Sequence, residues 1–169
     1  MIDYGGMSLA EYRDALASDA PTPGGGTAAA VALSQGAALA VMVCNLTLGK
    51  ERWQGGWSTA ESCMKIAKPL LEKGHKLARE DAEAFELVMS AFRMPKSNED
   101  EIAVRKSAIQ DGTLGAAMVP METAKLAYDL LNILPDLAST GNGNAVTDVG
   151  VAGLLVSAAC KGALFNVDI

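Results

Sequence analysis

The fold is decided by the stretch Pro21–Gly49, whose sequence is PTPGGGTAAAVALSQGAALAVMVCNLTLG. Three glycines flanked by proline open it, and a long run without a single charged residue follows. Proline and glycine interrupt regular helices, so we expect a helix to begin just after the glycines and to cover residues 27–48. A helix that is apolar on all sides is either the central helix of a bundle or a membrane span.

The polar content of this helix separates the two interpretations. The polar residues Ser34, Gln35, Asn45 and Thr47 interrupt the apolar run, and seven of its positions are alanines, which gain little from transfer into lipid. No aromatic belt flanks the run, and its ends carry no lopsided excess of Lys or Arg. We therefore predict the buried helix of a soluble protein, with a membrane span as the less favoured alternative.

The rest of the chain continues the helical pattern. Its turn and capping residues predict further helices over residues 8–18, 58–92, 98–120, 121–134 and 148–165. Pro69 is expected to kink or split the helix over residues 58–92. Hydrophobic residues make up 50% of the 169 positions and aromatic residues only 5%, a composition that favours closely packed helices over sheets. The sequence predicts a single all-α domain, a multi-helix up-and-down bundle spanning residues 1–169.

Charge and cysteine content exclude several classes of function. The net charge is −6 and no basic block occurs, so binding to nucleic acid has no electrostatic basis. The three cysteines, Cys44, Cys63 and Cys160, are widely spaced and odd in number, which is typical of free thiols in a reducing compartment. The first residues contain no secretion signal, so we expect a cytoplasmic protein. A single histidine and no cysteine cluster support no metal site.

Asp81 stands out because it lies on an apolar helix face. At 100° per residue, Leu77, Phe85 and Val88 share its side of the helix. A carboxylate in that position either forms a structural pair or lines a pocket with a perturbed pKa.

Asp148 repeats the pattern at the start of the last helix, where a helix dipole favours a carboxylate whatever the function. The loop before it contains Asn142 and Asn144, which can present amides to a ligand or simply form a turn.

Further polar groups lie around the first long helix. The amides of the glycine triplet are placed at a helix N-terminus, which suits an anion or only a tight turn. Asn45 is expected in mid-core, where an amide must find partners. Lys50 follows the helix end, where it complements the helix dipole or meets an anionic ligand. His75 shares its face with Lys68, Glu72 and Arg79, which is typical of a solvated surface.

These motifs together resemble the cyclodeaminase/cyclohydrolase family, which includes stand-alone methenyltetrahydrofolate cyclohydrolases and the C-terminal domain of formiminotransferase-cyclodeaminase. The matching segments are PTPGGGTAAAVALSQGAALAVMVCNLTLGK, EDAEAFELVMSAFRMPK, the VP of AAMVPMETA, GNGNAVTDVGVAGLL and FNV. The forms CNLTLGK and GNxN look closer to the stand-alone cyclohydrolases. Thr147 replaces an expected serine, and relatives continue into another long helix after the position of Ile169, so a shortened domain is one expectation.

The resemblance implies an all-α homodimer that hydrolyses 5,10-methenyltetrahydrofolate to 10-formyltetrahydrofolate. It implies no cofactor beyond the tetrahydrofolate substrate itself. Formiminotetrahydrofolate cyclodeamination and a non-catalytic folate-binding module are the alternatives. It also implies roles for individual residues. Asp81 and Asp148 are candidates for the base or the cation stabiliser, and Lys50 for the partner of the substrate's glutamate tail. The substrate-binding candidates are Gly24, Gly25, Gly26, Thr27, Asn45, Phe85, Asn142 and Asn144.

Overall fold

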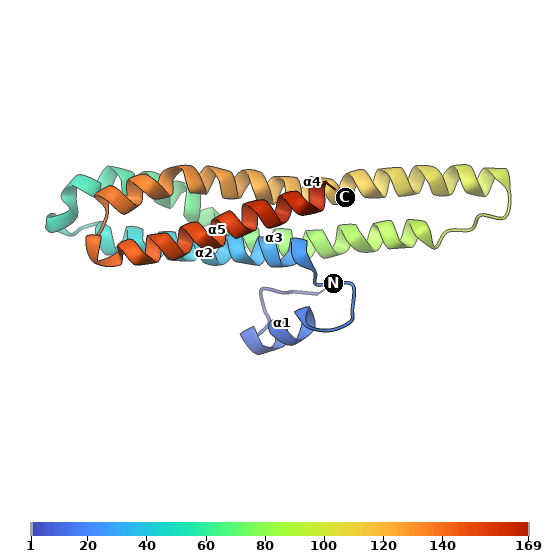
Figure 1. The fold of residues 1–169 in the computed structure, drawn as a ribbon, viewed down its shortest axis with the longest axis horizontal. Helices are drawn as coiled ribbons and strands as arrows, with labels where there is room; N and C mark the ends of the chain where they lie inside the picture. Colours follow the sequence, from blue (N-terminus) through green and yellow to red (C-terminus); the bar gives the residue numbers. More distant parts are fainter. Residues whose placement is uncertain (1, 169) are drawn as a thin grey trace.

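Four long helices lie side by side in the structure, a computed structural model that describes residues 2–168 (Figure 1). Two short 3₁₀ turns, Glu51–Gly56 and Gly143–Ala145, join them at one end of the bundle. No strand occurs among the described residues, so the predicted all-α bundle is confirmed. The α-helices are α1 (Leu9–Leu16), α2 (Gly25–Thr47), α3 (Trp57–Phe92), α4 (Glu99–Thr140) and α5 (Val146–Val167).

The four long helices form a closed ring of neighbours. Helix α2 packs between α3 and α5, and α4 packs between the same two helices on the opposite side. Small residues at the contacts let the helices approach closely. A Cβ added at Gly36 of α2 would lie 2.5 Å from Val156 of α5, and one added at Gly74 of α3 would lie 2.7 Å from Ser34 of α2. Alanine and glycine on α2 therefore determine how tightly the bundle closes.

Helix α4 corrects the expected helix boundaries. The sequence suggested one helix ending near Pro120 and another ending before Pro135, but α4 runs without a break from Glu99 to Thr140. A proline inside a helix removes one backbone hydrogen bond and costs about 3 kcal/mol. Pro120 is buried, and α4 packs along both α3 and α5, so tertiary packing outweighs that local cost. Helix α3 likewise continues through Pro69 and is not split there.

The hairpin formed by α3 and α4 extends beyond the other helices (Figure 1). Helix α2 begins, and α5 ends, at the level where this hairpin leaves the four-helix region. We call this the near end of the bundle, and the opposite end, where α2 stops and α5 starts, the far end. Exposed apolar side chains, among them Leu87, Val104 and Leu114, lie on the hairpin.

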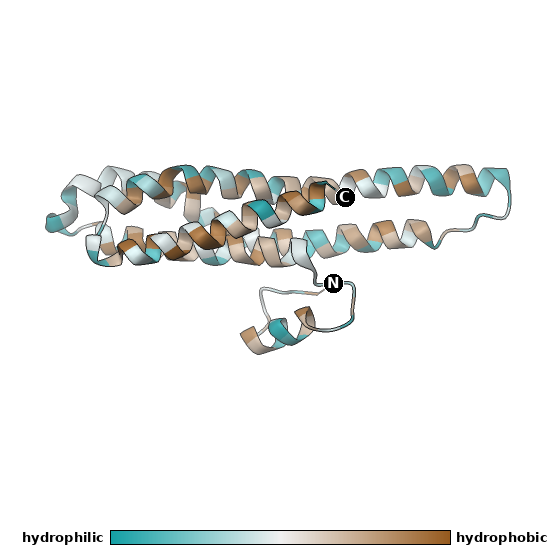
Figure 2. Ribbon diagram, in the orientation of Figure 1, coloured by the Kyte–Doolittle hydropathy of each residue, from teal (hydrophilic) through white to brown (hydrophobic). Residues whose placement is uncertain are grey.

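Two helices, α2 and the segment Gly143–Val167 that contains α5, are long and apolar enough to cross a membrane (Figure 2). In α2, 56% of the most apolar window is buried inside the bundle, as expected of a core helix. In the second segment only 28% is buried. Leu154, 74% exposed, and Phe165, 71% exposed, lie on the outer surface of α5. Helix α5 therefore presents an apolar face that the described chain leaves uncovered.

Candidate active site

A cavity of about 470 Å³ lies at the near end, where four helices converge. The start of α2, the middle of α3 and α4, and the end of α5 form its walls. Its volume falls in the range that binds small organic ligands. The lining residues are Pro21, Thr22, Gly24, Gly25, Gly26, Asp81, Phe85, Val88, Phe92, Thr113, Ala116, Ala117, Asn166 and Val167.

Asp81 is the one ionisable side chain among those lining residues. The hydroxyl of Thr27 donates a hydrogen bond to Oδ2 of Asp81 over 2.8 Å. Gly26 passes so close to the carboxyl group that an added Cβ would lie 2.7 Å from Cγ of Asp81 and would collide with Oδ1. The expectation that Asp81 faces a cleft is thus confirmed, and Gly26 is required for this approach. Thr27 is completely buried, so its position suits holding Asp81 rather than contacting a ligand.

The start of α2 supplies a favourable field for this carboxylate. Gly24 is the N-cap, no side chain caps the helix, and the first turn contains no acid of its own. The free backbone amides at a helix N-terminus carry partial positive charge, and glycines, which have no side chains, leave these amides accessible. Asp81 lies against this turn through its contacts with Gly26 and Thr27. The glycine triplet therefore serves the carboxylate directly as well as opening the cavity.

Burial dominates the protonation of Asp81. Removal of water from the carboxylate raises the pKa of Asp81, and hydrogen bonds from Thr27 lower it in part. A carboxyl group with a raised pKa exchanges protons closer to neutral pH than an ordinary aspartate, which suits general acid–base chemistry.

Replacing Thr27 by valine tests this balance. Thr27→Val keeps the side-chain volume but removes the donor that favours the ionised form, so the pKa of Asp81 rises further. A reaction that needs the carboxylate then loses turnover several-fold on the acidic side, and the acidic limb of its pH profile moves to higher pH. Thr123→Val removes a buried hydroxyl in α4 that bonds only within its own helix, and its profile should match wild type. An unshifted limb in Thr27→Val contradicts the assignment.

The remaining walls are mainly apolar. Phe85, 37% exposed, and Phe92 offer ring faces for stacking, and Phe85 lies where the sequence predicted it. Asn166 and Thr113 add polar groups that were not among the predicted site residues. Asn166 donates through Nδ2 to the carbonyl of Gly162 over 2.8 Å, and an added Cβ on Gly25 would lie 3.8 Å from the same nitrogen. In the sequence, Asn166 is a polar residue at the end of an otherwise apolar helix, and this pattern could have identified it as a candidate site residue.

The other predicted residues lie at the far end. The end of α2 and the start of α5 are surrounded by Asn45, Lys50, Asn142, Asn144 and Asp148. Helix α2 has 23 residues, which at 1.5 Å per residue separates its two ends by about 34 Å. Within one chain, these residues therefore do not join Asp81 in a single pocket.

Hydrogen bonds at the far end show which side chains are already engaged. Nδ2 of Asn142 donates to the carbonyl of Leu46 over 3.0 Å, and its backbone amide donates to the hydroxyl of Thr47 over 3.0 Å. Oδ1 of Asn142 accepts from the amide of Asn144 over 3.0 Å. Asn142 therefore ties the loop to the end of α2.

Asn45 differs from its prediction, whereas Asp148 lies as predicted. Asn45 is exposed on α2, so the expectation of a mid-core amide is wrong, because this position lies on the side of the helix that faces away from the bundle. Asp148 lies in the first turn of α5, as predicted, and is half-buried. Lys50 and Asn144 are exposed. The far end thus presents a cation, a carboxylate and free amides.

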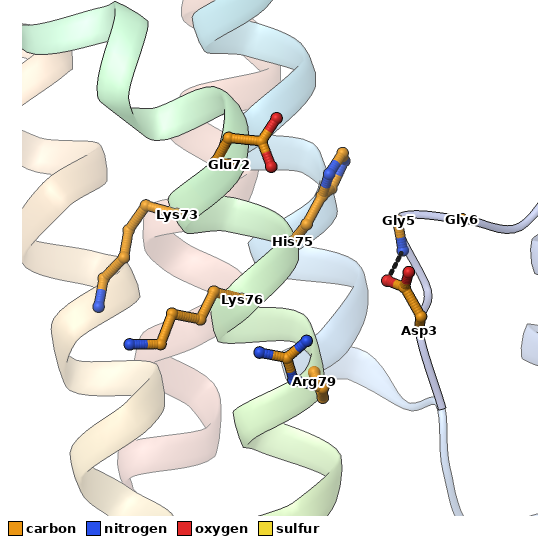
Figure 3. Close-up of a pocket in the computed structure, with 8 residues that line it drawn as sticks. All are labelled: Asp3, Gly5, Gly6, Glu72, Lys73, His75, Lys76 and Arg79. Carbon is orange, nitrogen blue, oxygen red and sulfur yellow. Dashed lines mark hydrogen bonds between the residues drawn. The ribbon is translucent and has the colours of Figure 1, made fainter. Parts of the chain in front are cut away.

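A larger but more open cavity, about 730 Å³, lies between α3 and the N-terminal segment (Figure 3). It contains His75, whose ring is half-buried beside Gly5 rather than fully solvated. Its lysines and its arginine are already paired: Lys73 lies 2.7 Å from Glu122, Lys76 lies 3.4 Å from Glu80, and Arg79 lies 4.0 Å from Glu83. This cavity is the more open of the two, whereas Asp81 is desolvated among apolar walls, so the Asp81 cavity is the better candidate.

Comparison with known proteins places the chain in a family. Residues 8–169 match the family model described as formiminotransferase-cyclodeaminase. Methenyltetrahydrofolate cyclohydrolase of Methylorubrum extorquens is 36% identical over 163 residues, covering 96% of this chain and 78% of that protein. Formimidoyltransferase-cyclodeaminase of Rattus norvegicus is 31% identical over 160 residues, and the match covers 95% of this chain but only 30% of that protein.

A solved structure agrees in fold as well as in sequence. The crystal structure of formiminotetrahydrofolate cyclodeaminase from Thermotoga maritima superposes with a TM-score of 0.83 at 34% identity. The superposition covers 96% of this chain and 77% of that one. The chain therefore belongs to the formiminotransferase-cyclodeaminase family, as its sequence motifs predicted.

Proposed function

We propose that this protein is a methenyltetrahydrofolate cyclohydrolase, which adds water to 5,10-methenyltetrahydrofolate and opens its ring to 10-formyltetrahydrofolate. The observation that carries the proposal is the desolvated carboxylate of Asp81 in a cavity with apolar and aromatic walls. The likeness to the Methylorubrum cyclohydrolase supports the choice of reaction. The substrate is a cation with a flat ring system, and it matches both the charge and the walls of the cavity.

The reaction adds water at one carbon and requires proton transfers from the water oxygen and to N5. The methenyl carbon belongs to an amidinium and is already electrophilic. As water attacks it, the Asp81 carboxylate takes one proton and the C–O bond forms. The bond from this carbon to N5 then breaks, and the Asp81 carboxyl group returns the proton to N5. The hydroxyl proton leaves as the formyl C=O forms, so one proton is released in total.

The position of Asp81 favours this cycle in two ways. Before attack, the ionised carboxylate stabilises the cationic substrate electrostatically, more strongly in a partly dry cavity than in water. After attack, a raised pKa makes the protonated carboxyl group available to the leaving nitrogen. Phe85 and Phe92 provide surfaces on which the substrate rings can stack.

Cyclodeamination of 5-formiminotetrahydrofolate is the second candidate, and the Thermotoga structure supports it. In that reaction N10 attacks the formimino carbon, and the proton of N10 passes to the formimino nitrogen. The protonated form of Asp81 would supply a second proton to this nitrogen, which then departs as ammonia while the methenyl cation forms. The same carboxyl group thus serves either reaction, as an initial base in hydrolysis and as an initial acid in deamination.

Turnover with each substrate separates the candidates. A cyclohydrolase consumes the absorbance of methenyltetrahydrofolate without forming ammonia, whereas a cyclodeaminase generates that absorbance and ammonia from the formimino compound. If the protein binds folate tightly but turns over neither substrate, it is a non-catalytic folate-binding module and neither enzyme.

Three expectations from the sequence stand as part of the proposal. The amidinium is reactive by itself, so the reaction as written uses no cofactor beyond the folate. The acidic chain is expected to act in the cytoplasm without nucleic acid. It is expected to form a homodimer and not to reside in a membrane. Sizing at several concentrations, with and without detergent, tests the last expectation.

A further inference from the structure

The prolines inside the long helices differ in what surrounds them. Pro69 of α3 and Pro135 of α4 are exposed, whereas Pro120 of α4 is buried. A proline has no N–H, so the carbonyl group four residues earlier loses its helical hydrogen bond. Beside an exposed proline, water can reach that carbonyl oxygen. The carbonyl group that Pro120 frees belongs to Ala116, on the inner side of the bundle, and a buried backbone acceptor needs a partner.

Ala116 faces the Asp81 cavity. It lines that cavity together with Thr113 and Ala117 of the same helix. At about 100° per residue, Pro120 lies about 40° from Ala116 around the helix axis, within the arc that the three lining residues span. A helix carbonyl group points along the axis toward the residue four positions later. The freed oxygen therefore lies between Ala116 and Pro120, on the helix face that forms the cavity wall.

The same oxygen lies near the level of Asp81, on the opposite wall. Helices α3 and α4 run antiparallel (Figure 1), and a Cβ added at Gly112 of α4 would lie 3.5 Å from Cα of Val88 in α3. Seven residues from this contact along each helix, Val119 is level with Asp81. The freed carbonyl group of Ala116 therefore lies within about one helical turn of the level of Asp81.

Side-chain donors near this part of the cavity are engaged elsewhere. The hydroxyl of Thr123 donates to the carbonyl of Val119 over 3.2 Å. Nδ2 of Asn166, in the wall formed by α5, donates to the carbonyl of Gly162 over 2.8 Å. The carbonyl group of Ala116 is thus an acceptor that a bound molecule can use, and a ligand that supplies an N–H donor satisfies it.

Resting on the proposed function, we infer that the carbonyl group of Ala116 accepts a hydrogen bond from the pterin ring of the folate, and that Pro120 is a positioning residue that keeps this acceptor free. The pterin carries two donors, its 2-amino group and N3–H, at the end of the ring system away from N5. A donor held at Ala116 leaves the other end, where the methenyl bridge lies, to Asp81 on the opposite wall. A ring without these donors would leave the acceptor unpaired, so the same contact selects the substrate.

Pro120→Ala tests the inference by closing the helical hydrogen bond. The new N–H at position 120 takes the carbonyl group of Ala116 as its partner. We expect kcat/KM for methenyltetrahydrofolate to fall about ten-fold, mainly through KM, because one hydrogen bond to the substrate is lost. The melting temperature should equal or exceed that of wild type, because the helix gains a bond. Unchanged kcat/KM in a folded Pro120→Ala protein overturns the inference.

Pro135→Ala is the matched control. It makes the same change in the same helix, at an exposed position roughly 22 Å farther from the cavity. It should keep the kcat/KM of wild type. An equal loss in Pro135→Ala would attribute the effect to a change in α4 as a whole and would overturn the role of Pro120. Where Pro120→Ala does not fold, a measurement on the wild-type chain decides instead.

Nuclear magnetic resonance reads the carbonyl group of the wild-type chain directly. With alanine labelled by ¹³C at the carbonyl and ¹⁵N at the amide, the amide of Ala117 reports the carbonyl resonance of Ala116, and the pair Ala37–Ala38 in α2 serves as reference. Saturation with 5-formyltetrahydrofolate, which has the pterin but no methenyl bridge, should shift the Ala116 resonance to higher frequency. p-Aminobenzoylglutamate, which lacks the pterin, should leave it in place.

The outcomes separate the inference from the proposed function. No shift at Ala116 with bound 5-formyltetrahydrofolate, or an equal shift with p-aminobenzoylglutamate, overturns the contact with the pterin. A chain that shows the pterin-dependent shift but does not turn over methenyltetrahydrofolate would fail the proposed function alone. Turnover by wild type without the shift would fail the inference alone.

Discussion

Asp81→Asn is expected to reduce turnover of methenyltetrahydrofolate by roughly 10²–10⁴-fold, the usual contribution of a general acid–base group. Asparagine has the same shape and can still accept the hydrogen bond from the hydroxyl of Thr27. It can neither take a proton from water nor stabilise the substrate cation. The loss should therefore appear in kcat rather than only in KM, and a steady-state assay on both parameters checks it.

The same variant should not lose stability near neutral pH. Burial raises the pKa of Asp81, so the folded protein holds a proton that the unfolded chain releases at an ordinary pKa of about 3.9. Between those two pKa values the native state binds more protons, and wild-type stability falls as pH rises. Asp81→Asn removes this penalty. Its melting temperature should equal or exceed that of wild type at pH 7, and the difference should disappear below pH 4.

A matched control separates loss of chemistry from loss of charge. Glu83→Gln changes an exposed carboxylate on the same helix that does not line the cavity. Its turnover should equal that of wild type. A fully active Asp81→Asn protein would remove Asp81 from the mechanism, and a variant with a sharply lowered melting temperature would point to a structural role instead.

Gly26→Ala is expected to reduce kcat/KM by about 100-fold, because a new methyl group collides with the carboxyl group of Asp81. Gly26 is fixed within the first turn of α2, so the aspartate must rotate away and give up its bond to Thr27. A displacement of about 1 Å at a reacting group is sufficient for a loss of this size. Overpacking should also lower the melting temperature, on the order of 5 °C.

Two further variants isolate the collision. Gly162→Ala adds the same methyl group at a helical glycine where the nearest atom, Cβ of Ala29, is 3.6 Å away, so its stability and turnover should be unchanged. Combining Gly26→Ala with Asp81→Ala removes the clashing group, and the double variant should regain stability without regaining activity. Equal stability losses in the single and double variants would show that glycine is needed for its backbone alone.

Local patterns in the sequence were sufficient for most of the helices. The uncharged run after the glycine triplet predicted α2, and the apolar face around Asp81 correctly placed this carboxylate against a cleft. The prolines were misleading, because residues 99–140 form one helix in spite of Pro120 and Pro135. Packing against α3, and against α5 within the four-helix region, stabilises α4, and no local propensity contains that contribution.

What the sequence determined by itself is the family, the helical class and the identity of the polar groups, because these depend on residue types and on spacing along single helices. Which of those groups share a cavity was decided by tertiary structure alone. Gly26 and Thr27 meet Asp81 because α2 begins beside the middle of α3 at the near end. Lys50, Asn142 and Asp148 lie about 34 Å away, at the other end of α2. The two ends of a straight helix lie as far apart as the helix is long, so the fold can separate residues that belong to the same sequence motif.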